Sequence, residues 1–303
     1  MDEPFQIREW TVPHAFGGIV RVFCARIAPM PSPEIPDEIV AHYEQYDEQT
    51  RLRDGDGQLE SARTRLLIER YFPAPPAVVL DIGGGPGVYA NWLAEAGYTV
   101  HLRDPMPRHI DEATASAHPG SPLASATVGD ARELDFDDDL ADAVLLLGPL
   151  YHLTGLDDRL RALREARRVL RPGGVVLAAG VSRFASALDG LWRNLSADPE
   201  FRTILERDLA EGQHRNPTGN LTYWTTAYFH RPDELRDELN DAGFERSEVV
   251  AVEGIGWIMP DFEDRWADPA NRRHILDIVA LTEREPAILG VSQHLLGVGW
   301  SPA

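Results

Sequence analysis

Short apolar runs alternate with helical stretches over most of the chain, and this alternation predicts the fold. Strands are predicted at Ala77–Leu80, Thr99–Leu102, Ser125–Val128, Ala143–Leu147, Val175–Ala179, Ser247–Val252 and Gln293–Trp300. Helices are predicted at 88–96, 156–170 and 232–242. Strands that alternate with helices in this way are typical of an α/β fold with a doubly wound, mostly parallel sheet and right-handed crossovers.

Two segments depart from this alternation. Residues 36–72 carry apolar side chains at helical spacing on either side of an Asp-Gly-Asp-Gly turn at 54–57, which predicts N-terminal helices that close as a lid. Residues 183–231 are rich in aromatics and are predicted to cap the carboxyl edge of the sheet. We therefore expect an N-terminal extension with lid helices (1–72), a core (73–182), a cap (183–231) and a C-terminal part of the sheet (232–303). The role of residues 1–36 stays open.

The strongest chemical signal is the glycine-rich loop that follows the first of these strands, in Val79–Gly87. Glycine is needed where the backbone turns sharply and a ligand touches the main chain, and ligands of doubly wound sheets bind beyond the carboxyl ends of the strands. Gly85, Gly87 and Ala90 also fit a dinucleotide fingerprint. However, Pro86 has no N–H for a pyrophosphate, and the Asp81 carboxylate favours a cationic ammonium or sulfonium ligand.

Acidic residues follow the next two strands as well. Asp104 ends the second strand, where a carboxylate can accept hydrogen bonds from ribose hydroxyls. Asp130 follows the third strand, where it can accept from an adenine amino group while the Ala131 N–H donates to the ring. Gly-Asp pairs are common in turns, so Asp130 alone is weak evidence for a binding site. It becomes informative because it is the third acid that follows a predicted strand.

With these motifs, residues 37–182 resemble the class I S-adenosylmethionine (SAM)-dependent methyltransferases of the UbiE-like small-molecule type. The resemblance implies a seven-stranded Rossmann-like sheet of order 3-2-1-4-5-7-6 with the seventh strand antiparallel, and SAM as cofactor. The implied contacts are Asp81, Gly83, Gly85 and Gly87 with the methionine part of SAM, Asp104 with the ribose, Asp130 and Ala131 with the adenine, and the Leu147 carbonyl with the ammonium. Met106 departs from the small polar residue that many members have, and is expected to pack on the adenine.

Candidates for catalysis lie after the fourth strand. His152 is the candidate general base because imidazole titrates near neutral pH, although a histidine bound to a backbone carbonyl is an equal alternative. Tyr151 is expected to orient the acceptor or SAM, or merely to pack. Tyr43, Tyr46, Arg51 and Arg63 are lid candidates, and Arg63 is the one expected to pair with the SAM carboxylate. Trp257, Met259, Phe262 and Trp266 are expected to form a pocket wall.

Composition narrows the functional classes. The formal net charge is −20, and all 29 basic residues are Arg. Such a surface disfavours nucleic acid and anionic membranes as partners, and with them an rRNA methyltransferase. Cys24 is the one cysteine, which excludes an intrachain disulfide and a Cys-rich metal site and suits a reducing cytoplasm. No metal site is expected, because the acidic run Asp137–Asp139 has no nearby histidine in sequence.

The sequence therefore predicts a cytoplasmic enzyme that transfers the SAM methyl group to an oxygen, nitrogen or carbon of a small organic acceptor. An NAD-dependent oxidoreductase on a similar sheet and a non-catalytic SAM-binding protein remain alternatives. The acceptor stays open, and so does the oligomeric state, for which a homodimer is one option.

Overall fold

The computed structural model describes residues 7–13, 19–25, 36–45 and 48–303, and it divides the chain into two compact units, 1–34 and 35–303. The first unit holds an antiparallel hairpin of β1 (Ile7–Pro13) and β2 (Ile19–Ala25), in which Ile7 lies opposite Ala25. The segments predicted as lid helices, core, cap and C-terminal strands all fall within the second unit.

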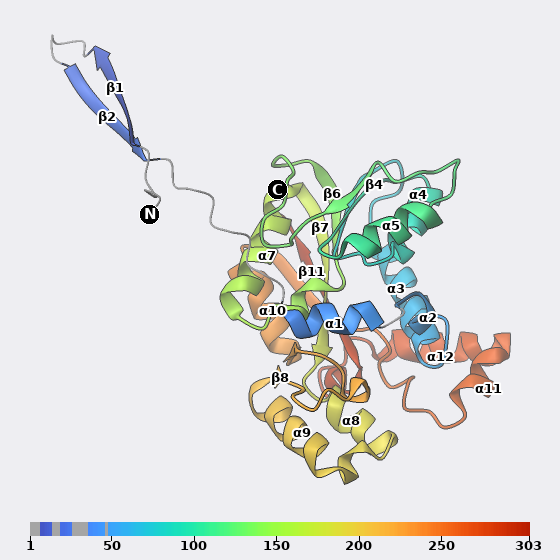
Figure 1. Cartoon of the computed structure of the whole chain (residues 1–303). Helices are drawn as coiled ribbons and strands as arrows, with labels where there is room; N and C mark the ends of the chain where they lie inside the picture. The colour runs from blue at the N-terminus through green and yellow to red at the C-terminus, as the bar shows by residue number, and fades with distance from the viewer. Residues whose placement is uncertain (1–6, 14–18, 26–35, 46–47) are drawn as a thin grey trace. The chain divides into compact units, whose positions relative to one another are not determined.

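A central sheet organises this second unit (Figure 1). Its main path runs β10-β11-β7-β6-β3-β4-β5, and β11 is antiparallel to both of its neighbours. In chain order these strands are β3 (Val78–Ile82), β4 (Thr99–Asp104), β5 (Ser125–Val128), β6 (Ala141–Leu146), β7 (Leu170–Ser182), β10 (Arg246–Ala251) and β11 (His294–Trp300). This confirms the predicted α/β fold and the strand order 3-2-1-4-5-7-6 along this path.

The predicted count of seven strands is wrong, because the sheet has nine. Two short strands, β8 (Gln213–His214) and β9 (Ala227–His230), branch from β7. The reason is the length of β7, which continues past Ala179 to Ser182, so that Val181 and Ser182 pair in parallel with Phe229 and His230. At its other end, the partners of β6 in β7 shift from Leu170 to Val175, so the pairing of these two strands is irregular there.

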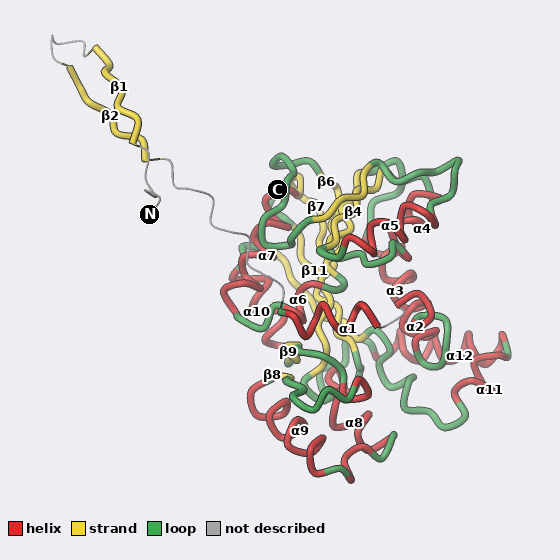
Figure 2. The backbone as a smooth tube through the Cα atoms, viewed as in Figure 1, coloured by secondary structure: helices red, strands yellow, loops and turns green. Residues whose placement is uncertain are grey.

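Helices cover both faces of the sheet (Figure 2), and the strand periodicity explains why. Alternate residues of one strand point to opposite faces. Thus Val144 of β6 packs with Leu163 and Leu235, whereas Leu145 packs with Leu67 and Leu93 on the other face. The helices of the first face are α7 (Leu156–Val169) and α10 (Pro232–Asp241), and those of the second are α3 (Gly57–Tyr71), α4 (Val88–Glu95) and α5 (Pro107–Ser116).

The remaining helices lie mainly at the carboxyl edge of the sheet. Figure 1 shows α8 and α9 gathered at one end of the strands. Two aromatics of the cap, Phe201 and Tyr223, form a small core there with Ile204. These helices are α1 (Asp37–Gln45), α2 (Glu48–Arg51), α6 (Pro149–His152), α8 (Ala185–Trp192), α9 (Pro199–Glu211), α11 (Phe262–Ala267) and α12 (Pro269–Thr282), with 3-10 turns η1 (Leu195–Ala197), η2 (Leu221–Tyr223) and η3 (Leu289–Val291). Within the described residues, none of the helices has the length and apolar character needed to span a bilayer.

Candidate active site

The glycine loop joins the end of β3 to the start of α4, and its conformation requires glycine. Gly83, Gly85 and Gly87 have φ angles of +69°, +55° and +80°, which side chains with a Cβ rarely adopt. A Cβ on Gly83 would lie 2.4 Å from the Pro149 ring, so this residue is also closely packed. A Cβ on Gly85 would meet no described atom within 4 Å. The middle of the loop therefore faces open space, as a ligand cradle must.

The Asp81 carboxylate lies directly against this loop. The residue is 1% exposed, and among the described residues neither carboxylate oxygen has a hydrogen-bond partner. A Cβ on Gly84 would lie 2.5 Å from Asp81 Oδ2. Burial and the charge of Asp104 raise the pKa of Asp81 to about 7, against the smaller opposing effect of the Ala90 backbone N–H, which points toward the carboxylate without the geometry of a hydrogen bond. A buried and unpaired acid of this kind is expected where a cationic ligand completes the site.

Asp104 ties the loop to the end of β4. Its Oδ2 accepts a hydrogen bond from the Gly85 N–H at 2.9 Å, and its Oδ1 accepts from the Met106 N–H and from His109 Nδ1, both at 2.9 Å. A carboxylate offers about four acceptor positions, so one is left for a further donor such as a ribose hydroxyl. The buried His109 in α5 is a supporting residue that sequence reasoning missed, because no motif links it to Asp104. Met106 is half-buried just before α5.

Asp130 and Ala131 follow β5, as expected from the sequence. The Asp130 carboxylate is held by Arg132, whose backbone N–H and Nε both donate to Oδ1 and whose Nη2 donates to Oδ2 at 2.6 Å. Ala131 is buried beside it. The structure thus fixes this carboxylate at the correct sheet edge, and its contact with adenine stays a prediction.

Arg63 has a different environment from the one expected. Its side chain is 1% exposed, its Nε donates to the Val252 carbonyl at 3.0 Å, and its Nη2 donates to Glu283 Oε2 at 2.6 Å. The guanidinium therefore joins α3 to the end of β10 and to the residue after α12. This corrects the predicted role, because a guanidinium committed to Glu283 is not presented to a SAM carboxylate. Of the other lid candidates, Arg51 pairs with Glu60, and Tyr46 lies outside the described residues.

The loop after β6 brings together residues of α1, of the sheet edge and of the segment 183–231. Leu147 and Gly148 lead into α6, and a Cβ on Gly148 would lie 2.9 Å from the Gly83 carbonyl oxygen. His152 Nδ1 lies 3.2 Å from the Thr226 carbonyl, to which it can only donate, so in the neutral ring the lone pair is on Nε2. The Tyr43 hydroxyl of α1 donates to that Nε2 at 2.6 Å. The Tyr151 ring packs edge-on against His152. Sequence reasoning named Tyr43 and His152 separately but missed Thr226.

A separate pocket of about 410 Å³ lies between the turn before α3, α8 and α11. Three of the four predicted wall residues, Trp257, Met259 and Phe262, line it, and Trp266 does not. Trp266 instead stacks behind Phe262 with ring centroids 5.4 Å apart. The other lining residues are Gly55, Asp56, Asp189, Trp192, Arg193, Asp261, Glu263 and Asp264, so the pocket is predominantly acidic and aromatic.

Comparison with known proteins identifies the family. Residues 80–178, from β3 to β7, match the model of a methyltransferase domain. The ubiquinone/menaquinone biosynthesis C-methyltransferase UbiE of Caulobacter sp. is 33% identical over 210 residues, which cover 63% of this chain and 79% of that protein. The chain belongs to the class I SAM-dependent methyltransferases of the UbiE-like type. The predicted family resemblance is therefore confirmed.

Two further similar proteins show how far the similarity extends. An uncharacterized methyltransferase of Mycobacterium tuberculosis is 38% identical over 107 residues, which are 35% of this chain and 41% of that relative. The match thus spans about two fifths of that relative's length. A putative SAM-dependent methyltransferase from Listeria monocytogenes shares the fold with a TM-score of 0.54 at 18% identity, and the alignment covers 81% of this chain and all of that structure.

The residues around the glycine loop fit the family's cofactor. SAM carries an ammonium and a sulfonium, and the unpaired buried Asp81 carboxylate is the kind of group that such cations require. The open space at Gly85 allows close approach to the backbone. By contrast, Pro86 removes a donor that a pyrophosphate would need, so the loop suits SAM better than NAD.

Proposed function

We propose that this protein is a SAM-dependent methyltransferase that acts on a small organic molecule, at an oxygen, nitrogen or carbon atom, in the cytoplasm. The observation that carries the proposal is the buried, unpartnered carboxylate of Asp81 against a glycine loop whose centre is open. When bound, SAM supplies a methyl group on a positively charged sulfur. The chain's own task is then to bind that cation and to align the acceptor with it.

Asp81, Gly83, Gly85 and Gly87 would hold the methionine part of SAM. The further contacts proposed are Asp104 to the ribose, Met106, Asp130 and Ala131 to the adenine, and the Leu147 carbonyl to the ammonium. The acceptor would lie beyond α6, near Tyr151 and His152. The hydrogen bond from His152 Nδ1 to the Thr226 carbonyl makes Nε2 the basic nitrogen of the neutral ring, and the Tyr43 hydroxyl now donates to it. An acceptor that must lose a proton would displace this hydroxyl or pass its proton through it, and on this basis His152 is the proposed general base. Tyr43 would position that ring.

Calorimetric titration of the full chain with SAM and with its demethylated product tests the proposal. We expect one molecule of either ligand to bind per chain. Incubation with SAM and a panel of phenols, quinols and amines should then release the demethylated product with at least one acceptor class. A folded protein with no affinity for either ligand would overturn the proposal, and binding without turnover on any acceptor would favour a non-catalytic SAM-binding protein.

Replacing His152 with Gln should lower kcat on a proton-losing acceptor by about a hundredfold, because general base catalysis typically contributes this much or more. The pH dependence of kcat should flatten, while SAM affinity stays near the wild-type value. Tyr43→Phe is the matched control, since it removes only the hydroxyl that contacts the ring, and we expect a loss of less than about tenfold. An unchanged pH profile in His152→Gln would assign His152 a structural role.

A further inference from the structure

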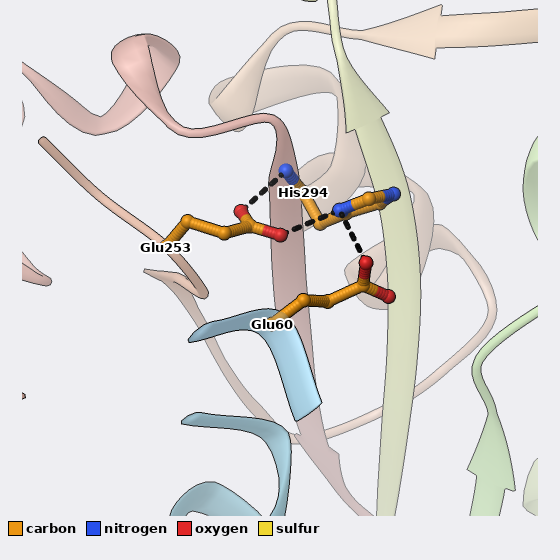
Figure 3. Close-up of side chains that lie close together, drawn as sticks. All are labelled: Glu60, Glu253 and His294. Carbon is orange, nitrogen blue, oxygen red and sulfur yellow. Dashed lines mark hydrogen bonds and ion pairs between the residues drawn. The ribbon is translucent and has the colours of Figure 1, made fainter. Parts of the chain in front are cut away.

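Three side chains that are far apart in the sequence converge beside the sheet (Figure 3). Glu60 lies in the first turn of α3, Glu253 follows β10, and His294 is the first residue of β11. The imidazole Nδ1 of His294 lies 2.6 Å from Glu253 Oε1 and 3.8 Å from Glu60 Oε2. Each residue directs one metal-ligating atom at the others, and the three atoms lie within 4.8 Å of one another.

The cluster lies at the edge of the sheet where ligands of this fold bind. His294 pairs with Val181 near the carboxyl end of β7, and its neighbour Leu295 pairs with Ala251 at the carboxyl end of β10. The glycine loop after β3 and the α6 loop after β6 leave the sheet at the same edge, because β3, β6 and β7 are parallel. Glu253 is buried, and Glu60 and His294 are partly buried.

Hydrogen bonds from neighbouring residues hold the two carboxylates of the cluster in place. Glu253 Oε2 accepts hydrogen bonds from the Ser292 hydroxyl at 2.8 Å and from the backbone N–H of His294 at 2.9 Å. Oε1 is therefore the oxygen that faces the imidazole. Arg51 donates to Glu60 Oε1 at 3.0 Å and also contacts Oε2. Outer bonds of this kind orient the ligands in metal sites.

The geometry of the cluster favours a cation here. Two carboxylates lie beside the imidazole, with Arg51 next to Glu60, and a bound metal ion would take the place of the proton that joins His294 Nδ1 to Glu253 Oε1. Ligand atoms about 2.1 Å from a metal ion are roughly 3.0 to 3.4 Å from one another in octahedral or tetrahedral sites. The observed separations of 2.6 and 3.8 Å lie on either side of that range, so shifts of less than about 1 Å would form the site.

We propose that Glu60, Glu253 and His294 bind a divalent transition-metal ion, with Mn²⁺, Fe²⁺ or Zn²⁺ as the class. Mixed imidazole and carboxylate ligands suit these ions, whereas Mg²⁺ and Ca²⁺ prefer oxygen alone. Three protein ligands leave coordination positions open, which is typical of catalytic rather than structural sites. The expected occupant is an anionic oxygen of the methyl acceptor, and only this last part rests on the proposed function.

The experiment measures metal binding without SAM or acceptor, so that its outcome is independent of methyl transfer. The chelator-treated full chain is titrated with Mn²⁺ while the electron paramagnetic resonance signal of free Mn²⁺ is followed, and Zn²⁺ is then added as competitor. The variants are Glu253→Gln and His294→Gln, which remove different ligands. Glu248→Gln is the control, because Glu248 is a β10 acid that contacts Tyr71 and Arg284 instead.

We expect one Mn²⁺ per chain, displaced by Zn²⁺, with an affinity that falls more than about tenfold in both ligand variants and is retained in the control. Circular dichroism identifies a variant that fails to fold, and the other variant then decides. Lack of saturable binding up to about 1 mM metal would overturn the proposal and leave the cluster as an ion-pair network. Equal affinity in the wild type and in every folded variant would overturn it as well.

Discussion

The Asp81→Asn variant is expected to bind SAM about a hundredfold more weakly than the wild-type protein. Asn keeps the shape of the side chain but removes the charge, and loss of one partner of a buried charge pair typically costs about 2–5 kcal/mol. Wild-type affinity should also fall as the pH drops below about 7, because the cation must then displace a proton from Asp81. Titration calorimetry at pH 6 and pH 8 measures both effects, and the variant should show little pH dependence.

The same substitution should stabilise the SAM-free protein at high pH. The pKa of Asp81 is raised from 3.8 to about 7, so the folded state binds more protons than the unfolded state between these values. The free energy of unfolding therefore falls as the pH rises from about 4 to 7, by about 4 kcal/mol in all at 1.36 kcal/mol per pKa unit. The Asp81→Asn variant has no carboxylate to ionise at this position, so its unfolding free energy does not fall over this pH range. At pH 8 and without SAM, the Tm of the variant should therefore exceed that of the wild type.

Asp111→Asn is the matched control for both measurements, because it makes the same change in net charge on the exposed surface of α5. It should alter neither SAM affinity nor the pH dependence of Tm. If the Asp81→Asn variant bound SAM as tightly as the wild-type protein, this result would contradict the assignment of Asp81 to the cation site. A lower Tm in that variant at pH 8 would contradict the raised pKa.

Replacing Arg63 with Met should destabilise the fold by about 3 kcal/mol. The variant removes the three hydrogen bonds that the buried guanidinium donates and leaves Glu283 buried with fewer partners, and breaking a buried pair costs about 3–5 kcal/mol. The remaining contacts of Glu283 with Arg70 and Arg284 place the expected loss at the lower end. Denaturant unfolding measures it. SAM affinity of the folded variant should change by less than about threefold.

Arg70→Met provides the comparison, because Arg70 pairs with the same Glu283 but is 37% exposed. Exposed pairs contribute roughly 0–1 kcal/mol, so this variant should stay close to the wild type. A large loss of SAM affinity in folded Arg63→Met, with unfolding free energy unchanged, would restore the cofactor role that the sequence suggested and contradict the structural one.

The site residues differ in how far sequence could predict them. Asp81 and the glycines are adjacent in the chain, and their spacing between a strand and a helix determines their place in the fold. Asp104 was predictable as a strand-end acid, but its bond to the Gly85 N–H depends on how β3 and β4 are aligned. Arg63 was misassigned because a sequence pattern does not distinguish an arginine directed at a ligand from one directed at Glu283, 220 residues away.

The sequence by itself determined the α/β class and the cofactor loop, because periodicity and local turn chemistry act over a few residues and right-handed crossovers restrict the topology. The strand order was implied by the resemblance to the methyltransferase family. Only the tertiary structure decided that β8 and β9 extend the sheet, that Tyr43 and Thr226 hold His152, and that Glu60, Glu253 and His294 meet. Those contacts join residues separated by dozens to hundreds of positions. Their formation depends on side-chain packing and strand register, which no local pattern encodes.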